Sequence, residues 1–177
     1  MGNTYSSCPP EIADFIADQH MFFVATAPMG SDAHINLSPK GLDTLRVLDE
    51  QHVAYLDITG SGAETIAHLR ENGRITLMFC AFKGDPLTVR IYGKGRASLP
   101  NDPEFNDLIE KFPPQPGTRS IIIVEISRVS TSCGFGTPQY TFATEREELP
   151  TAMKFTDVPA YQAKMNRESI DGLPALP

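Results

Sequence analysis

The stretch LDITGSGAETIAHLRENGRITLMFC, residues Leu56 to Cys80, decides how the rest of the chain is arranged. It predicts a strand, a Gly-rich turn, a short helix and a second strand in direct succession. Ser61 and Glu64 have the spacing of a capping box, and Asn72-Gly73 is typical of a left-handed helix end. The start of such a helix gathers unpaired N–H groups at the positive end of its dipole, so it attracts anions such as phosphate. Many helix starts share this pattern without a ligand, so the turn alone leaves both interpretations open.

The composition is that of a single folded domain over all 177 residues. Hydrophobic residues make up 41% and charged residues 21%, which is ordinary for a globular protein. The net charge of −7 argues against nucleic acid or acidic lipid as the main partner, because both need a positive surface. No apolar run reaches membrane-spanning length, and the N-terminal residues do not resemble a secretion signal. We therefore expect a cytoplasmic protein without a membrane partner.

The three cysteines, Cys8, Cys80 and Cys133, are too few and too scattered for a disulfide framework or a zinc site. Cys133 follows a serine and precedes the Gly-rich segment GFG. No histidine or acidic residue stands near it, which favours a packed loop thiol over a nucleophile. We expect no metal site, and the sequence identifies no catalytic residue.

The N-terminal part predicts a helix over Pro9–Gln19 and a hairpin of Met21–Ala27 with His34–Leu37. The hairpin ends in the turn Ser38-Pro39-Lys40-Gly41, where a hydroxyl and an ammonium stand beside two turn-forming residues. This turn either carries a polar function or is a solvated surface turn. A third strand, His52–Ile58, leads into the Gly-rich turn.

The C-terminal part begins with the strand Arg74–Phe82, which is apolar on both faces. Thr88–Ser98 predicts a strand in which Gly93 and Gly95 indicate either a bulge or a close backbone approach. Its Arg90 is either a ligand-binding or a structural ion-pair residue. Further along, we expect a helix that starts at Asn101-Asp102-Pro103-Glu104 and ends at Pro113-Pro114, a buried strand over Ser120–Ile126, an edge strand over Gln139–Thr144 and a polar tail.

Together these elements predict a small, closed, mainly antiparallel α+β barrel of about six strands with short helices. A single small barrel has one interior to fill, so the second apolar face of Arg74–Phe82 needs a partner. We therefore expect a homodimer that buries Met78 or Phe82 at its interface.

Five motifs in this order resemble the pyridoxamine 5'-phosphate oxidase-like family, in particular its uncharacterised branch. They are INLSPKG at Ile35–Gly41, DITGSGAETIAHLRENGRITLMFCAF at Asp57–Phe82, VRIYGKG at Val89–Gly95, STSCGFGTPQY at Ser130–Tyr140 and SIDGLP at Ser169–Pro174. The resemblance implies a six-stranded split β-barrel with an N-terminal helix and a C-terminal extension. It also implies a homodimer with two FMN sites, each built from both subunits.

The resemblance also identifies candidate flavin-binding residues. These are Asn36, Ser38, Pro39, Lys40, Asp57, Thr59, Ser61, Gly62, Glu64, Thr65 and Arg90. Ser38 to Lys40 match the family strand that borders the flavin ring, with the lysine near the phosphate. Asp57 to Thr59 match the next strand along the flavin, and Ser61 onward matches the phosphate turn.

The chain departs from the true oxidases at two points. Gly62-Ala63, followed by Glu64, stands where those enzymes carry Arg-Lys, and the chain has no tryptophan to match the one that closes their substrate site. We therefore do not expect a true pyridoxamine 5'-phosphate oxidase. The leading hypothesis is an FMN-binding oxidoreductase of unknown small-molecule substrate, with FAD or a deazaflavin as alternative cofactors. The alternative is a non-enzymatic flavin carrier, or a cofactor-free split-barrel dimer that binds a small ligand.

Overall fold

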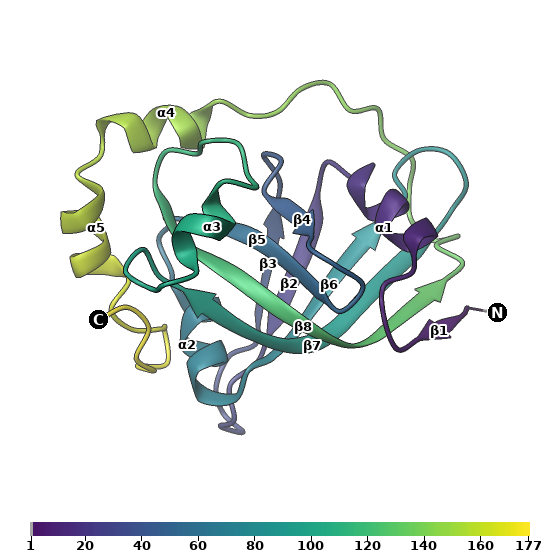
Figure 1. Cartoon of the computed structure of the whole chain (residues 1–177). Helices are drawn as coiled ribbons and strands as arrows, with labels where there is room; N and C mark the ends of the chain where they lie inside the picture. Colours follow the sequence, from purple (N-terminus) through teal and green to yellow (C-terminus); the bar gives the residue numbers. More distant parts are fainter. Residues whose placement is uncertain (1) are drawn as a thin grey trace.

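The structure, a computed structural model, describes residues 2–177. Within them the chain forms eight strands and five short helices (Figure 1). Their bounds are β1 Thr4–Tyr5, α1 Pro10–Ala17, β2 Phe22–Thr26, β3 Asn36–Lys40, β4 Leu45–Val47, β5 His52–Ile58, α2 Glu64–Asn72, β6 Arg74–Cys80, β7 Thr88–Ser98, α3 Phe105–Ile109, β8 Thr118–Ser132, α4 Glu148–Phe155 and α5 Val158–Met165. None of these helices has the length and apolar character needed to cross a bilayer.

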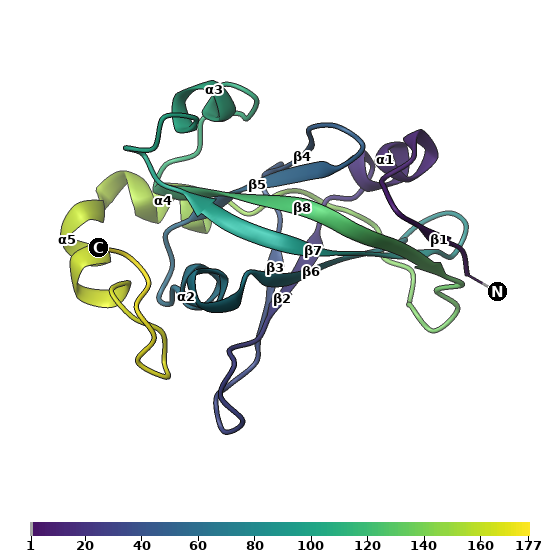
Figure 2. The ribbon, with the colours of Figure 1, turned by 60° about the horizontal axis from the view of Figure 1, so that its bottom comes forward.

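The strands form one curled antiparallel sheet in the order β3-β2-β6-β7-β8-β5-β4, and β1 pairs with β8 outside this path. Figures 1 and 2 show the sheet wrapping around α2 as a half-barrel. The predicted fold class, a mainly antiparallel α+β split barrel, is confirmed. Two details of the prediction were wrong: the strands number eight within residues 2–177, and the two ends of the sheet, β3 and β4, do not pair to close it.

Several predicted elements are confirmed at residue precision. Strands β5 and β7 have the predicted bounds: β5 is a short apolar run that is buried on both faces, and β7 alternates over Val89–Tyr92. Gly73 ends α2 with a φ of 71°, the left-handed conformation that glycine adopts without strain. The pairing of β7 with β8 shifts register between Tyr92 and Gly93, where a bulge was one of the two predicted possibilities.

Other local predictions were wrong. Ser38-Pro39-Lys40 does not form a turn; these residues complete β3, and Pro39 is tolerated there because β3 is an edge strand. Gln139–Thr144 forms no strand. The tail is not irregular, since it contains α4 and α5, whose burial is too slight to leave a clear apolar period in the sequence.

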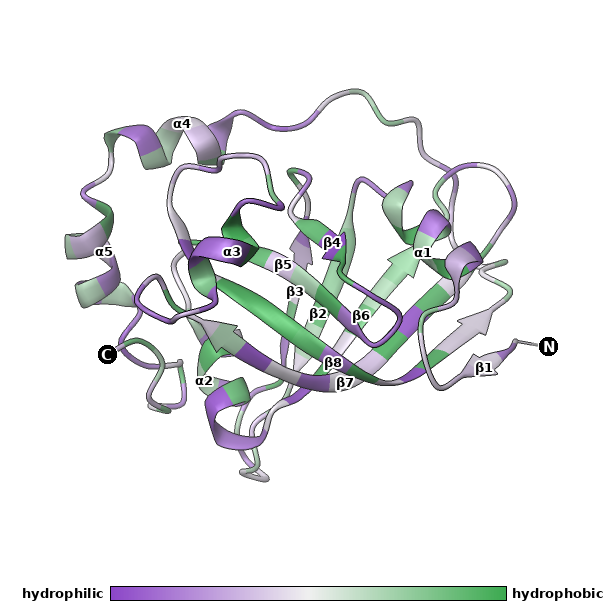
Figure 3. Ribbon diagram, in the orientation of Figure 1, coloured by the Kyte–Doolittle hydropathy of each residue, from purple (hydrophilic) through white to green (hydrophobic). Residues whose placement is uncertain are grey.

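The core lies inside the curl of the sheet. It combines side chains of β2, β5, β6, β7 and β8 with the buried edges of α1 and α2. A second, smaller cluster lies on the other face of β5 and β8, where Leu56 and Ile121 pack under α3. Figure 2 shows α2 and α3 on opposite sides of the sheet. Figure 3 shows the green, hydrophobic stretch of β8 that both clusters share. The first half of β8, residues 119–124, is therefore buried on both faces, as its run of Ile and Val predicts.

Candidate functional site

Three charged side chains meet where β3, β5 and the start of β8 come together. Arg119 donates two hydrogen bonds to the Asp57 carboxylate, at 2.8 Å from Nε and 3.1 Å from Nη2, and the Ser120 hydroxyl donates a third at 3.1 Å. The ammonium of Lys40 lies 3.8 Å from Asp57 Oδ1. Asp57 is 1% exposed and Arg119 is 5% exposed, so this ion pair lies inside the protein.

The charges of this cluster do not balance. Two cations, Lys40 and Arg119, share the single carboxylate of Asp57. Each nitrogen of the Arg119 guanidinium is engaged: Nε and Nη2 donate to Asp57, and Nη1 donates to the carbonyl of Gly62 at 2.8 Å. Lys40 is 23% exposed and has only the longer contact to Asp57. The surplus positive charge is therefore on Lys40, and an anion would be stabilised beside it.

Lys40 opens onto a cavity of about 570 Å³, which we call the Lys40 cavity. Phe82, Tyr140 and Phe142 line its walls, and Lys83 contributes a second cation. Mostly apolar walls with a few fixed charges are typical of small-molecule sites, and the volume falls within the range of roughly 300–1,000 Å³ for such sites.

The predicted Gly-rich turn is covered by the C-terminal segment. Gln162 donates to the Thr59 hydroxyl at 2.8 Å, and Asn166 donates to the Gly60 carbonyl at 3.0 Å. Thr59 is fully buried as a result. The residues after 144, which were predicted to form a polar tail, therefore contribute one wall of this region (Figure 1).

The capping box predicted from Ser61 and Glu64 was wrong. Helix α2 begins at Glu64 with Ala63 as its N-cap, and no side chain caps it. The Glu64 carboxylate instead accepts a hydrogen bond from the backbone N–H of Ile170 at 3.2 Å, while Ser61 is exposed. A carboxylate at this position opposes a dianion, so the start of α2 is a poorer phosphate site than its sequence suggests.

A buried polar network fixes β3 against α2. The Asn36 amide donates to the hydroxyls of Thr26, at 3.2 Å, and Thr65, at 3.1 Å. Nδ1 of the fully buried His68 lies 2.9 Å from the Thr26 hydroxyl. Asn36 and Thr65 are therefore predicted site residues that the structure brings together, and they hold the strand that carries Lys40.

The remaining predicted residues lie on the two faces of the sheet. Ser38 pairs with Val24 and shares the inner face with Lys40, whereas Pro39 is exposed on the outer face. Arg90 pairs with Met78, also on the outer face, and donates to the Ser132 hydroxyl at 3.2 Å. Within one chain, Arg90 is therefore separated by the sheet from the Lys40 cluster.

Tyr55 lies fully buried close to this cluster. Burial, and secondarily the charge of Asp57, raise the pKa of Tyr55 well above its ordinary value. The phenol therefore stays protonated under ordinary conditions and adds no charge to the cluster.

Three residues of the site escaped the sequence analysis: Arg119, Gln162 and Asn166. Arg119 is next to the buried run that begins at Ser120, and a charged residue beside such a run signals a buried partner. Its partner, Asp57, is 62 residues earlier in the chain, so the pair becomes visible only when β5 and β8 are placed side by side.

The fold and the site together place this protein in a structural class: split β-barrels whose inner sheet face carries a charged cluster beside a cavity. The sequence profile of the family described as Pyridoxamine 5'-phosphate oxidase matches residues 8–133. A protein of Aspergillus flavus described as pyridoxamine 5'-phosphate oxidase family protein ustO is 38% identical over 192 residues, which cover 97% of this chain and 77% of that protein. The chain belongs to the pyridoxamine 5'-phosphate oxidase family.

Solved structures share the fold at lower identity. HupZ of Group A Streptococcus is 18% identical, with a TM-score of 0.52 over 68% of this chain and 90% of HupZ. A protein of Mesorhizobium loti described as FAD-binding is 15% identical, with a TM-score of 0.52 over 74% of this chain and 96% of that protein. These similarities establish the half-barrel as the common architecture.

Proposed function

We propose that this protein binds FMN and acts as a flavin-dependent oxidoreductase on a small-molecule substrate. The observation that carries the proposal is the surplus positive charge on Lys40, next to a cavity large enough for a flavin. Family membership supports it, and so does the FAD-binding description of the Mesorhizobium loti protein with the same fold. Its sequence departs from the true oxidases, so the substrate we propose is not pyridoxamine 5'-phosphate.

The side chains present fit FMN better at Lys40 than at the start of α2. The charge of Lys40 is only partly balanced by Asp57. At the start of α2, by contrast, Glu64 places a carboxylate, and the C-terminal segment covers the adjoining turn. Lys40 would therefore hold the phosphate, and Ser38 on the same strand face would border the ring. An ammonium–phosphate hydrogen bond of this kind contributes about 1.5–3 kcal/mol.

When bound, the flavin supplies the hydride chemistry, and this chain binds, orients and shields it. The buried ion pair of Asp57 with Arg119 fixes β5, the strand that carries Asp57. The network of Asn36 and Thr65 fixes the strand on which Lys40 itself lies. Both supports keep the ammonium in place before the cofactor arrives, which lowers the entropy cost of binding.

The test is to purify the protein and record the absorbance spectrum and mass of whatever copurifies. We expect flavin absorbance, or saturable binding when FMN is titrated into the colourless protein, with FAD and a deazaflavin as parallel titrations. A protein that is colourless and binds none of the three would exclude the proposal.

A second candidate function is a non-enzymatic flavin carrier. It is motivated by the missing Arg-Lys pair of the true oxidases, in whose place this chain has Gly62-Ala63. The two candidates differ in turnover. The rates to compare are the reduction of flavin by NADH or NADPH and its reoxidation by an acceptor, each for bound and for free flavin. If the bound flavin reacts no faster than the free flavin, the protein is better described as a carrier.

A further inference from the structure

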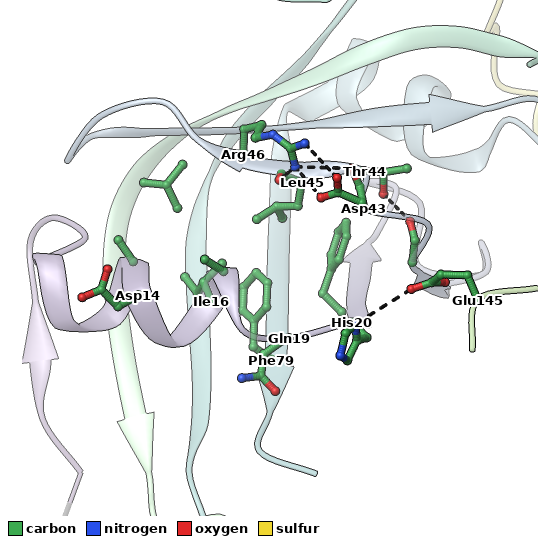
Figure 4. Close-up of a pocket in the computed structure, with 15 residues that line it drawn as sticks. Asp14, Ile16, Gln19, His20, Asp43, Thr44, Leu45, Arg46, Phe79 and Glu145 are labelled. Carbon is green, nitrogen blue, oxygen red and sulfur yellow. Dashed lines mark hydrogen bonds and ion pairs between the residues drawn. The ribbon is translucent and has the colours of Figure 1, made fainter. Parts of the chain in front are cut away.

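A second cavity, of about 710 Å³, lies between α1 and β4 (Figure 4). We call it the α1 cavity. It shares Gln19, His20, Gly41 and Glu145 with the Lys40 cavity, so these residues form the partition between the two. Nothing in the proposed flavin site uses its interior.

The floor of the α1 cavity is apolar and aromatic. Ile16, Phe22 and Phe79 line it and are 2%, 3% and 1% exposed, so the cavity reaches down to the main core. The rings of Phe22 and Phe79 stack with their centroids 5.7 Å apart. A ligand here would bury an apolar, ring-sized body on this floor.

The polar groups at the rim are mostly engaged already. The guanidinium of Arg46 binds both carboxylate oxygens of Asp43, at 2.6 and 3.0 Å, and lies over the Phe112 ring. The Thr44 hydroxyl donates to the Gly41 carbonyl at 2.7 Å. The one Lys or Arg that lines this cavity is therefore neutralised and cannot attract an anion.

Two further carboxylates lie at the rim. Asp14 lies at one end of the cavity and Glu145 at the other (Figure 4). Among the residues that the structure describes, neither forms an ion pair with a lysine or arginine. Glu145 lies 4.0 Å from His20, whose ring stacks flat on Phe142 with a centroid separation of 3.7 Å. This stack holds the residue 145 region against the cavity mouth.

The two neighbouring cavities thus have opposite electrostatic character. Around the Lys40 cavity, the cations Lys40, Lys83 and Arg146 outnumber the carboxylates of Asp18 and the shared Glu145. Around the α1 cavity, the carboxylates of Asp14, Asp43 and Glu145 outnumber the single cation Arg46. We propose that the α1 cavity is a binding site for an amphipathic organic cation, with the charge at Glu145 and the apolar body on Phe22 and Phe79. The binding site does not depend on the flavin, so it stands or falls separately from the proposed function.

The test uses three small probes of nearly equal shape and different charge. Binding of 2-phenylethylamine, 2-phenylethanol and 3-phenylpropionate to the full chain is measured by calorimetry and ligand-observed NMR at pH 8, where a free imidazole is neutral. A charge-assisted contact predicts that the amine binds roughly tenfold or more tightly than the alcohol. Repulsion by two carboxylates predicts that the propionate binds more weakly than either.

Three variants locate the binding. Glu145→Gln removes the charge but keeps an oxygen that can accept from the Leu42 N–H, a contact of 3.3 Å in the native chain. It should abolish the preference for the amine over the alcohol. Glu147→Gln, two residues further along and outside the cavity lining, is the matched control and should keep the preference. Ala17→Phe adds bulk at the cavity wall and should weaken both amine and alcohol, while thermal unfolding confirms that each variant is folded.

Equal affinity for the three probes would overturn the proposal, and so would an amine preference that survives in Glu145→Gln. Amine binding that is lost equally in Glu147→Gln would also overturn it, because the contact would then be a general effect of surface charge. Loss of FMN binding with intact amine binding would remove the proposed function and leave this site standing.

Discussion

Lys40 is the residue on which the cofactor proposal is most directly tested. We expect Lys40→Ala to weaken FMN binding about tenfold or more, because a charged hydrogen bond of roughly 1.5–3 kcal/mol is lost. Riboflavin, which has no phosphate, should bind almost unchanged. Parallel fluorescence titrations with FMN and riboflavin measure the difference.

The control for Lys40→Ala is its stability. Asp57 keeps both bonds from Arg119 in this variant, and a partly exposed ammonium at 3.8 Å contributes only about 0–1 kcal/mol. The variant should therefore unfold at nearly the native urea concentration. Equal losses of FMN and riboflavin affinity would mean that Lys40 contacts the ring or supports the fold, and the phosphate assignment would be withdrawn.

Unlike Lys40, Arg119 should contribute strongly to the stability of the fold. Arg119→Met leaves the Asp57 carboxylate inside the protein without its bidentate partner, and breaking a buried pair costs about 3–5 kcal/mol. Urea unfolding monitored by circular dichroism measures this loss. Adding Asp57→Asn to the same chain should recover part of the stability, since no buried charge then remains. A loss below about 1 kcal/mol would show that solvent or Lys40 compensates Asp57.

The contrast between Lys40 and Arg119 shows what could be predicted at this scale. A lysine in a short motif is found by its neighbours in the sequence, so the resemblance identified Lys40. Arg119 has no such motif, and its role depends on a contact with a strand that lies 62 residues earlier in the chain. Charges that meet through tertiary structure leave only a weak sequence signal.

At the scale of elements, prediction succeeded where burial follows a regular period. Strand β7 alternates over Val89–Tyr92, and β5 is a continuous apolar run between polar segments; the bounds of both were predicted correctly. Helices α4 and α5 have no fully buried residues, so no apolar stripe marked them. The second half of β3, from Ser38 to Lys40, was predicted as a turn because Pro39 and Gly41 are turn residues, yet pairing with β2 overrides that local preference.

Hydrogen bonds between His34 and the titratable carboxylate of Asp171 attach the C-terminal segment to the β2–β3 hairpin. The Asp171 carboxylate accepts hydrogen bonds at 2.8 Å from both Nδ1 and the backbone N–H of His34, and these bonds lower the pKa of Asp171 below its ordinary value of 3.8. A lowered pKa in the folded state means that the attachment is complete above the ordinary pKa and is lost as pH falls through the lowered value.

We therefore expect the His34 amide resonance to shift in an NMR titration with a midpoint below pH 3.8, as its acceptor becomes protonated. Asp171→Asn should remove this transition and leave the amides of β5 unaffected. A midpoint at or above the ordinary value would show that the His34–Asp171 contact does not persist in solution.

At the scale of the whole molecule, part of the outer face of the sheet is left uncovered by the other elements of residues 2–177. Register places Pro39, Phe23, Met78 and Arg90 in one row across β3, β2, β6 and β7, all on the outer face and all at least partly exposed. In the neighbouring row, Leu37 is 66% exposed. Helix α3 covers the other part of this face, over β5 and β8. A patch of this kind, largely apolar with a basic edge, is typical of an interface.

We expect this uncovered face to form a homodimer interface that buries Met78. Light scattering at micromolar concentration should give twice the mass of the chain, and Met78→Glu should shift the mass toward that of a monomer, because the new carboxylate would be desolvated between two sheets. Met29→Glu is the matched control: Met29 is 67% exposed on the β2–β3 loop, outside the two rows, and its replacement should leave the mass unchanged. A monomeric mass for the native chain would exclude the dimer.

The dimer prediction also bears on the flavin site, because Arg90 lies on the outer face and reaches a ligand only across an interface. If each site uses residues of both protomers, Met78→Glu should weaken FMN binding together with dimerisation. Lys40→Ala should weaken FMN binding without changing the mass. FMN affinity that is unchanged in a monomeric Met78→Glu variant would mean that one chain holds the cofactor by itself, and Arg90 would then be assigned to the interface alone.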